Sequence, residues 1–449
     1  MEMMRGHRTL TAGILVVLVV FGWIFYLFNW GISDREDRIT QSYRQALNLA
    51  EDYAERRLWQ KSILEYDAAI ELRNREEDRA AQLTVYQQAY EENPSSFYEG
   101  YLEAARQAAK TFPKNASFCL TTADLAIQNE NYALAYRTLR QSIDAKCKDE
   151  NVLKQYQEVQ YHYTLKGGTY SEIQSFSNGI YSVCDGTLWG GVDADGSDTV
   201  AFEYQMLGPV GADGVYVCAR DDTSGLIGDL NGILQGRLPF SPTAASAYSE
   251  GLVAVCDGKN YSYYDLLGDQ QFGSYESAGA FQNGVAAVET KDGWALVNTK
   301  GEVVSKRTYE AIVLDADGTY LTNGVMIAKI DGVYQLYDDK EQVVGNFSCD
   351  DVDGIKEDGI FAFCSDQKWG FADTDGNVLI EPSYKDAKSF SNGFGAVLIG
   401  NTWGFINIDG TLVIDDIFLN VDYFNDQGKC LVELGPGNWQ FIEMTIWEG

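Results

Sequence analysis

Side chains suited to acid–base or metal chemistry are unevenly supplied in this chain. Only two of the 449 residues are histidines, His7 and His162, and His7 precedes a long apolar segment. A Ser-His-Asp or Cys-His site beyond that segment would therefore depend on His162. Zinc sites that use several histidines are excluded by this number. We expect no catalytic residue, no metal site and no cofactor of these kinds.

The eight cysteines also lack a metal or redox motif, because no two of them form a Cys-x-x-Cys pair. Cys184, Cys256 and Cys364 each follow a repeated glycine by five residues. Equivalent positions in a repeat predict equivalent burial, so we interpret these three as small core residues. Cys119 and Cys147 lie in neighbouring helical segments and could form a disulfide bond outside the cytoplasm, which the sequence leaves open.

Carboxylates are abundant, with 66 Asp and Glu residues, and a pair of carboxylates is what glycoside hydrolysis requires. No pair stands out among so many. Asp-x-Asp-Gly strings at 193–196, 315–318 and 373–376 resemble parts of calcium loops, but the further ligands of an EF-hand are missing. Asp and Gly also favour tight turns. We therefore interpret the strings as turns and leave calcium binding open.

The C-terminal two-thirds of the chain repeats one short pattern about eight times, which predicts an array or a closed ring of one unit. Each copy begins at a glycine, 33 to 40 residues after the last. These anchor glycines are Gly179, Gly214, Gly251, Gly284, Gly324, Gly359, Gly393 and Gly428. In seven copies an aromatic residue follows by ten or eleven positions: Trp189, Tyr261, Trp294, Tyr334, Trp369, Trp403 and Trp439. The second copy has Ser224 there.

The repeated aromatic residues have two interpretations. Tryptophan and tyrosine rings can stack on sugars. However, these rings recur once per unit at a nearly fixed offset, and we interpret them as a structural core layer.

The clearest copy begins at Lys368-Trp-Gly-Phe-Ala-Asp-Thr-Asp-Gly376 and continues as an apolar stretch ending at Pro382-Ser-Tyr384. This order of Trp-Gly, Asp-Gly and Pro-x-Tyr resembles the WG repeat family of bacterial proteins. The resemblance covers roughly residues 170 to 449 and is strongest over 359–424. It implies β structure and a cell-surface or exported location, and it brings no defined catalytic residue.

Each unit of the repeat predicts three or four short strands. Asp409-Gly410 is typical of the tight turn in a hairpin. Eight such units could close into a β-propeller, which would protect the sheet edges. Tyr170-Ser-Glu-Ile173 matches the Tyr-led segment that ends other units, so it could complete the last unit and close the ring. An open β-solenoid is the alternative, and contacts between 170–180 and 430–446 distinguish the two.

Residues 10–30 form an uncharged stretch of 21 residues, long enough for a transmembrane helix. Aromatic residues cluster toward its C-terminal end, and it lacks the small-residue cleavage site of a signal peptide. We therefore expect an uncleaved anchor. Arg5 and Arg8 precede it, so the positive-inside rule places residues 1–9 in the cytoplasm.

Residues 31–168 are expected to be helical, because apolar and small residues recur at spacings of three and four. Two stretches, 49–70 and 123–143, are similar to tetratricopeptide repeats, in which small residues let paired helices approach closely. Pro94 and Pro113 mark helix ends between them. A concave helical surface for a partner is one interpretation, and a plain helical spacer is the other.

From Tyr170 onward the chain has 14 Lys and Arg residues against 43 Asp and Glu residues, a net charge of −29. Such acidity disfavours nucleic acid. It suits cationic partners, or it serves solubility alone. Together these patterns predict a multidomain fold with a cytoplasmic tail (1–9), one transmembrane helix (10–30), an all-α tetratricopeptide-like domain (31–168) and an all-β WG repeat domain (169–449).

The expected function follows from these domains. We expect a non-catalytic, membrane-anchored extracytoplasmic protein that binds a protein or a glycan through its repeat surfaces. A carboxylate-dependent extracytoplasmic enzyme that acts on glycans is the alternative.

Overall fold

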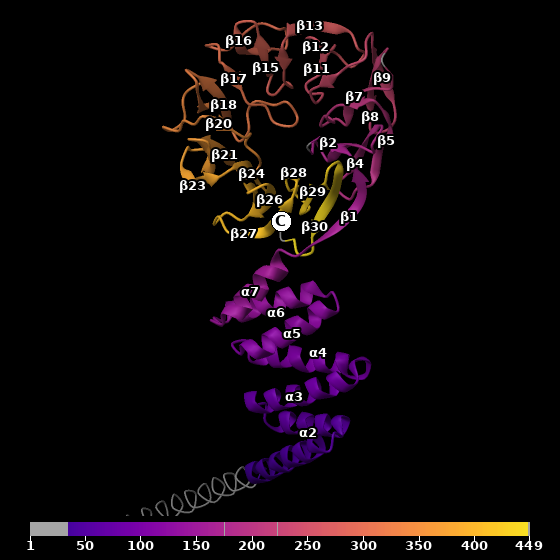
Figure 1. Cartoon of the computed structure of the whole chain (residues 1–449), viewed down its shortest axis with the longest axis vertical. Helices are drawn as coiled ribbons and strands as arrows, with labels where there is room; N and C mark the ends of the chain where they lie inside the picture. The colour runs from indigo at the N-terminus through magenta and orange to yellow at the C-terminus, as the bar shows by residue number, and fades with distance from the viewer. Residues whose placement is uncertain (1–34, 175, 222, 448–449) are drawn as a thin grey trace, which may run out of the picture. The chain divides into compact units, whose positions relative to one another are not determined.

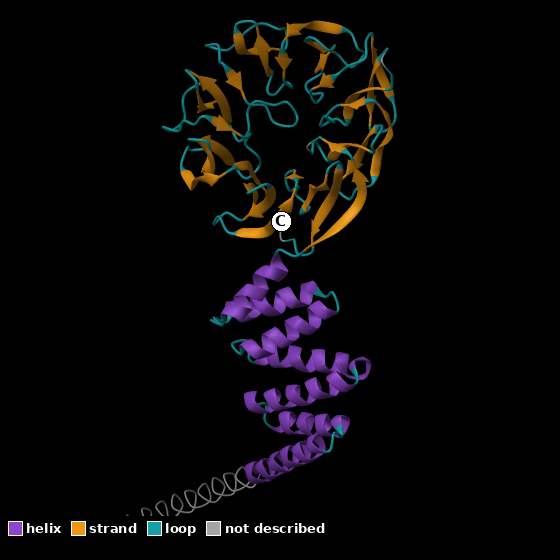
Figure 2. Ribbon diagram, viewed as in Figure 1, coloured by secondary structure: helices purple, strands orange, loops and turns teal. Residues whose placement is uncertain are grey.

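The computed structural model describes residues 35–174, 176–221 and 223–447. The chain divides into two compact units, Met1–Gln160 and Tyr161–Gly449. The described part of the first unit is helical and the second is built from strands (Figures 1 and 2).

The first unit consists of antiparallel helices that pack in sequence order. Residues 35–55 are helical. The helices that follow are α2 (Trp59–Leu72), α3 (Glu76–Glu92), α4 (Pro94–Thr111), α5 (Ala116–Gln128), α6 (Tyr132–Asp144) and α7 (Glu150–Gln160). The side chains of Asn93, Asn115 and Asn131 cap α4, α5 and α6 by accepting hydrogen bonds from backbone N–H groups of the first turn.

Small residues hold these helices close together. Ala105 in α4 and Ala123 and Ala126 in α5 are fully buried, and α3 packs on α4 and α5 on α6. The predicted helical character is confirmed, and the tetratricopeptide assignment stays a resemblance.

The predicted fold class is wrong in one respect, the transmembrane helix. Within the described residues, no helix is long and apolar enough to cross a membrane. The described helices bury one face against their neighbours and carry polar residues on the other. The expected span at 10–30 lies outside the described residues. The fold described is a series of helices followed by an eight-bladed β-propeller.

The second unit is that propeller, with eight antiparallel sheets arranged around a central axis (Figure 1). Blade 1 contains β2 (Glu172–Ile173), β3 (Ile180–Cys184), β4 (Trp189–Asp193) and β5 (Asp198–Tyr204). Blade 2 contains β6 (Met206–Leu207), β7 (Val215–Ala219), β8 (Gly225–Asp229) and β9 (Leu234–Leu238). Blade 3 contains β10 (Ala244–Ala245), β11 (Val253–Cys256), β12 (Tyr261–Tyr264) and β13 (Gln270–Tyr275).

The remaining blades follow the same order from the axis outward. Blade 4 contains β14 (Ser277–Ala278), β15 (Val285–Thr290) and β16 (Gly293–Asn298), and blade 5 contains β17 (Ala311–Ile312), β18 (Val325–Ile330) and β19 (Val333–Asp338). Blade 6 contains β20 (Asp351–Val352), β21 (Ile360–Ser365), β22 (Lys368–Asp373) and β23 (Val378–Tyr384). Blade 7 contains β24 (Asp386–Ser391), β25 (Phe394–Ile399), β26 (Thr402–Ile406) and β27 (Leu412–Phe418). Blade 8 contains β28 (Asn420–Val421), β29 (Lys429–Gly435) and β30 (Asn438–Met444).

The ring is closed by β1 (Tyr163–Tyr170), which pairs with β30 as the outermost strand of blade 8. Closure across the ends of the repeat is confirmed, and the open solenoid is excluded. The closing strand differs from the expected one, because only Tyr170 of the segment 170–173 takes part, opposite Trp439. The residues of β1 before Tyr170 are mostly exposed, so they show no apolar alternation that sequence could reveal.

Strand register explains the repeated aromatic residue. The residue five positions after each anchor glycine pairs with the repeated aromatic residue, as Cys184 does with Trp189 and Cys364 with Trp369. In blade 2 the corresponding pair is Ala219 and Gly225. The hairpin loop there, 220–224, is one residue longer than 185–188 in blade 1. The aromatic position of blade 2 is therefore occupied by Gly225, and the expected Ser224 lies in the loop.

The Ser-Asn pair before some anchor glycines joins neighbouring blades. In blade 7 the Ser391 hydroxyl donates to the backbone oxygen of Phe424 in blade 8 at 2.7 Å, and the Asn392 side chain donates to the same oxygen at 2.9 Å. In blade 1 the Ser177 hydroxyl lies 2.9 Å from the backbone oxygen of Val210 in blade 2. The repeat thus encodes contacts between blades as well as within them.

Candidate functional site

The most distinctive surface of the propeller is formed by the inner loops, the segments that link the first and second strands of each blade. They are residues 174–179, 208–214, 246–252, 279–284, 313–324, 353–359, 392–393 and 422–428. Nine of their residues are acidic: Asp213, Glu250, Asp315, Asp317, Asp353, Glu357, Asp358, Asp422 and Asp426. Lys356 is the one basic residue in these segments. The inner loops therefore concentrate negative charge around the propeller axis.

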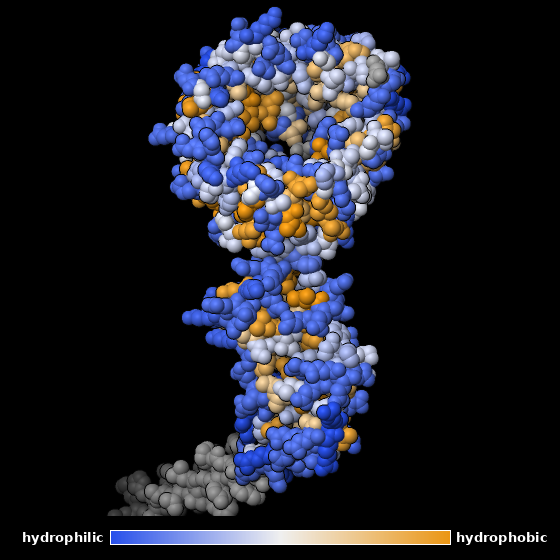
Figure 3. Space-filling model, in the orientation of Figure 1, coloured by the Kyte–Doolittle hydropathy of each residue, from blue (hydrophilic) through white to orange (hydrophobic). Residues whose placement is uncertain are grey.

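A cavity of about 290 Å³ opens among the inner loops of blades 1, 6, 7 and 8, and we call it the central cavity. Its lining combines aromatic rings with polar and charged groups: Phe176, Lys356, Glu357, Ser391, Asn392, Tyr423, Phe424, Asn425 and Asp426. Figure 3 shows the propeller hollowed at its centre, with hydrophilic residues over most of the outer rim. The cavity approaches the lower end of the size range of roughly 300–1,000 Å³ that is usual for ligand pockets.

Tyr423 is the fixed element of the central cavity. Its hydroxyl donates to the Asp353 carboxylate, with both oxygens within 2.9 Å. The Lys356 ammonium lies 4.2 Å from the centre of the Tyr423 ring, and the Lys388 ammonium lies 5.6 Å from it. Burial, and then the Asp353 charge, raise the pKa of Tyr423 well above its ordinary value. The phenol therefore stays neutral and holds the Asp353 carboxylate in place.

The inner loop of blade 5, residues 313–324, reaches across the axis. The backbone oxygen of Asp317 accepts from the N–H of Ala247 in blade 3 at 3.0 Å, and that of Gly318 accepts from Ala280 in blade 4 at 2.7 Å. The Asp317 carboxylate accepts a hydrogen bond from Ser177 in blade 1. Figure 2 shows this loop in teal inside the ring, between β17 and β18. It partly closes the channel and ties blade 5 to three other blades.

The carboxyl of Asp317 is held in an environment that disfavours its charge. Burial raises the pKa of Asp317, and the hydrogen bond from Ser177 partly opposes that shift. A carboxyl with a raised pKa could serve as a general acid. Asp317 is not among the residues that line the central cavity, and its carboxylate already binds Ser177. Its position suits a structural contact across the channel.

The aromatic residues singled out in the sequence lie elsewhere, and the structure does not bring them together. Each of the seven packs into a hydrophobic cluster between its own blade and a neighbouring blade. Trp403 and Trp439 are each only 8% exposed. The side chains that could have stacked on a sugar are thus used between the blades.

The other candidate residues are also accounted for. The Asp193 carboxylate accepts from the backbone N–H groups of Asp195 and Ser197 at 2.8 and 2.9 Å, which is a turn contact. Within the described residues, no group of three or more His, Cys, Asp or Glu side chains could hold a metal ion. Cys119 and Cys147 are free thiols. The His162 ring lies beside Thr445, 2.8 Å from its hydroxyl.

The inner loops were not identified as a site from the sequence. The signal that could have found them is the run of acidic residues just before several anchor glycines, as in Asp213, Glu250 and Asp358. Their convergence depends on the ring, which places the same position of every blade around one axis.

Comparison with known proteins agrees with the repeat. The family described as WG containing repeat matches residues 369–403 and 403–439, which lie in blades 6 to 8. The WG repeat resemblance is confirmed for this part of the chain. No curated protein matches the sequence.

The matches among solved structures are distant in sequence. BamB from Moraxella catarrhalis is 11% identical, with a TM-score of 0.41, over 63% of this chain and 100% of that chain. The Dos1 propeller is 11% identical, with a TM-score of 0.41, over 63% and 95%. Hsv2 from Kluyveromyces lactis is 9% identical, with a TM-score of 0.37, over 63% and 100%. The chain thus has helices followed by a β-propeller in which blades 6 to 8 match the WG containing repeat.

Proposed function

We propose that this protein is a non-catalytic binding protein, and that the inner loops of its propeller bind a basic segment of a partner protein. The observation that carries the proposal is the ratio of nine acidic residues to one basic residue in those loops. A cleft lined by one sign of charge focuses its field and attracts the opposite charge. A Lys- or Arg-rich segment has that charge.

The central cavity suits the end of one basic side chain. Glu357 and Asp426 supply carboxylates, and Phe176 and Phe424 supply rings. An ammonium or guanidinium group is stabilised both by carboxylates and by aromatic faces. Lys356 already lies over the ring of Tyr423, so the chain's own cation illustrates this preference.

A protein partner fits this surface better than a free ion does. The acidic residues lie in the inner loops of blades 2, 3, 5, 6 and 8, so an extended segment could contact several blades at once. Such electrostatic complementarity mainly sets specificity and association rate. Binding should weaken as salt is added, because exposed charges are screened within about 8–10 Å at moderate ionic strength.

Catalysis on glycans is not favoured by the inner loops. That chemistry needs one carboxyl that is protonated and a second that is charged beside the scissile bond. The inner-loop carboxyl with a raised pKa, Asp317, is bonded to Ser177 and does not line the central cavity. We therefore retain the non-catalytic interpretation as part of the proposal.

The test is binding of labelled Lys/Arg-rich peptides to the intact protein, followed by fluorescence anisotropy in low and moderate salt. The variant Glu357→Gln/Asp426→Asn removes two charges from the central cavity and should weaken binding by on the order of tenfold. The control variant Asp339→Asn/Asp375→Asn removes two exposed charges outside the inner loops and should leave binding nearly unchanged. Equal effects of the two variants would show that binding depends only on net charge and would contradict the proposed site.

The location outside the cytoplasm is a separate part of the proposal. It rests on the sequence of residues 1–30, where two arginines precede the apolar segment. Protease treatment of intact cells tests it. Degradation of the propeller in intact cells supports the location. Degradation that occurs only after the cells are lysed contradicts the location.

A further inference from the structure

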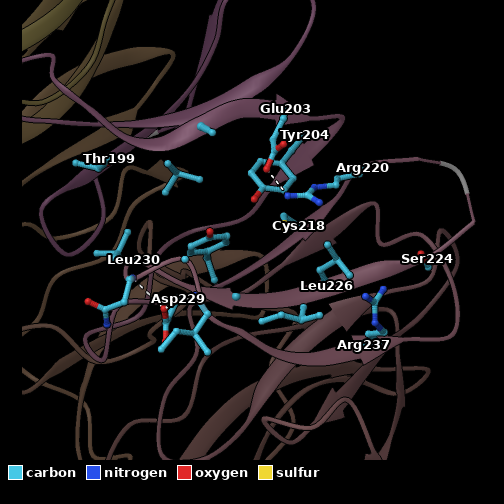
Figure 4. A pocket seen from close by; sticks show the side chains of 18 of the residues that line it. Thr199, Glu203, Tyr204, Cys218, Arg220, Ser224, Leu226, Asp229, Leu230 and Arg237 are labelled. Carbon is cyan, nitrogen blue, oxygen red and sulfur yellow. Dashed lines mark hydrogen bonds and ion pairs between the residues drawn. The ribbon is translucent and has the colours of Figure 1, made fainter.

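A second cavity lies away from the inner loops, between the outer strands of blades 1 and 2. It has a volume of about 480 Å³, and we call it the blade 1–2 cleft. One wall is β5 of blade 1, and the other is formed by β7, β8 and β9 of blade 2. Figure 4 shows the cleft with Glu203 and Arg220 on one side and Leu226 and Arg237 on the other.

The cleft lies at a position where blade 2 lacks a side chain that the other blades have. In each blade, one strand residue pairs with the residue two positions after the anchor glycine. This paired residue faces the preceding blade. In seven blades it has a side chain: Val192, Tyr264, Val297, Tyr337, Ala372, Ile406 and Ile442. In blade 2 it is Gly228, opposite Tyr216. The Tyr216 ring lies 3.3 Å from where a Cβ on Gly228 would be, and the cleft opens beside this pair.

The rim of the cleft holds an unusual share of the basic residues. Only three arginines occur from Tyr170 onward, and two of them, Arg220 and Arg237, line the cleft. Arg220 forms an ion pair with Glu203 and lies 5.5 Å from the centre of the Tyr204 ring. Arg237 lies in β9, where it pairs with Leu226 of β8 in the same wall (Figure 4). Both guanidinium groups thus come from blade 2, one from the loop after β7 and one from β9.

Hydrogen-bond acceptors accompany these donors. The Asp221 side chain also lines the cleft, and hydrogen bonds from Thr223 lower its pKa. Glu203 and Asp221 accompany the two arginines, and Asp229, which also lines the cleft, accepts hydrogen bonds within its own turn. The lining therefore carries both signs of charge. Such a rim does not favour an ion over a neutral ligand, but it does favour a ligand that both donates and accepts.

The floor of the cleft is apolar and chemically inert. Tyr204, Tyr216 and Cys218 are at least nine-tenths buried, and Leu226 is partly buried. Burial raises the pKa of Cys218 to about 12, so the sulfur is a thiol rather than a nucleophilic thiolate at neutral pH. Whatever enters is bound rather than modified through this cysteine.

From this geometry we infer that the blade 1–2 cleft binds an uncharged, hydroxyl-rich ligand, namely a short neutral glycan. Each sugar hydroxyl both donates and accepts hydrogen bonds, and the rim offers guanidinium donors beside carboxylate acceptors. The sugar's C–H faces would lie on the apolar floor. The volume is within the range of roughly 300–1,000 Å³ typical of ligand pockets. This site is separate from the inner loops and does not depend on the partner proposed there.

The experiment is a binding screen of the intact protein against immobilised neutral oligosaccharides and uronate-containing oligosaccharides, followed by calorimetry with the strongest binder. Arg237→Ala should weaken binding of a neutral glycan by about tenfold, the usual effect of losing a hydrogen bond to a charged group. Arg307→Ala removes the third arginine of the propeller, outside the cleft, and should leave the affinity unchanged.

A second variant tests the cleft without removing a charge. Gly228→Val installs the residue that blade 1 has as Val192 opposite Tyr181, so the pair of a tyrosine and a valine is known to fit this register. It should abolish glycan binding while the protein stays folded by circular dichroism. Retained binding in this variant would overturn the site. Binding of uronate-containing sugars alone, or of no sugar, would overturn the ligand class.

The two proposals fail separately. The inner-loop variant Glu357→Gln/Asp426→Asn should bind the glycan normally, and Gly228→Val should bind the basic peptide normally. Loss of both activities in either variant would show a general folding defect and would contradict both assignments.

Discussion

Blade 7 and blade 2 have the same strand order but differ in how they fill the space beside them. Blade 7 has the full repeat, and Trp403 and Phe405 pack against blade 8 in a continuous hydrophobic cluster. Blade 2 has Gly225 at the aromatic position and Gly228 at the position that faces blade 1. Blade 7 shows the packing that the full repeat provides. Blade 2 shows the result when two of the repeated side chains are missing.

The comparison teaches that the ring tolerates a degenerate blade because closure does not depend on any single interface. Gly225 leaves room for Pro242 and Leu238, which lie within 3 Å of where its Cβ would be. That side of blade 2 is therefore refilled from within the blade. At Gly228 the Tyr216 ring takes the place of the missing side chain, and the blade 1–2 cleft opens beside it.

The largest effect in this comparison is expected when the repeated aromatic residue of blade 7 is removed. Trp403→Ala should lower the free energy of unfolding by roughly 3–5 kcal/mol, because it leaves a cavity between blades 7 and 8. Leu226→Ala, in the wall of the already open cleft, should cost less than half as much. Chemical denaturation measures both. An unchanged midpoint for Trp403→Ala together with a lost ligand would assign the tryptophan to binding.

A smaller effect is expected from the hydrogen bonds between inner loops. Ser391 is 3% exposed and donates to Phe424 of the next blade at 2.7 Å. Ser391→Ala should cost about 1 kcal/mol, the usual value for one such hydrogen bond. Blade 2 has Ala212 at the equivalent position, so Ala212→Gly serves as a control that removes no hydrogen bond. A loss as large in the control would show that the effect comes from the backbone.

Repairing the degenerate blade should have a small effect of the opposite sign. Gly228→Val replaces a glycine inside a strand, and such glycines are destabilising by roughly 0.5–1 kcal/mol. The valine should therefore raise the melting temperature slightly. The Tyr216 ring lies 3.3 Å from the position of the added Cβ and must move by a few tenths of an ångström. A clear drop in melting temperature would mean that the ring cannot move.

The smallest effect concerns pH and contrasts blade 5 with blade 2. Burial raises the pKa of Asp317. The folded protein thus binds this proton more tightly than the unfolded chain does, so the contribution of Asp317 favours folding at low pH. That contribution is lost as pH rises from the ordinary carboxyl value, near 3.9, through the raised one. Asp317→Asn should therefore be more stable relative to wild type at neutral pH than in acid.

The carboxyl of Asp221 in blade 2 should change stability with pH in the opposite direction. Hydrogen bonds from Thr223 lower its pKa, so its contribution to stability is present at neutral pH and is lost as pH falls through the lowered value. Asp221→Asn should be less stable relative to wild type at neutral pH than in acid. Thermal melting at both pH values measures both variants, and parallel curves would contradict the two assignments.

Much of the propeller could be predicted from the sequence because its signals are local. The anchor glycines and Asp-Gly turns need positive φ, and the structure has Gly376, Gly393 and Gly410 in that region. The number of units and their strands follow from the period and from alternation within each hairpin. These features depend on residues close together in the chain.

The contacts between blades could not be predicted in the same way. Closure by residues 163–170, the crossing of the channel by Asp317 and the convergence of the inner loops all join residues far apart in sequence. The assignment of Ser224 failed because one added loop residue shifts the offset, and only strand pairing reveals the shift. The transmembrane helix, in turn, rested on residues 10–30, outside the described part of the chain.

The sequence by itself thus determined a repeat of eight acidic β units after a helical region, because turn and strand preferences act over a few residues. The tertiary structure alone decided where function could reside. Closing the ring placed nine acidic residues around one axis, and stacking the blades left a cleft beside Gly228. Both outcomes depend on packing between units. The repeated pattern describes what the units share, so it does not show how one unit packs differently from the others.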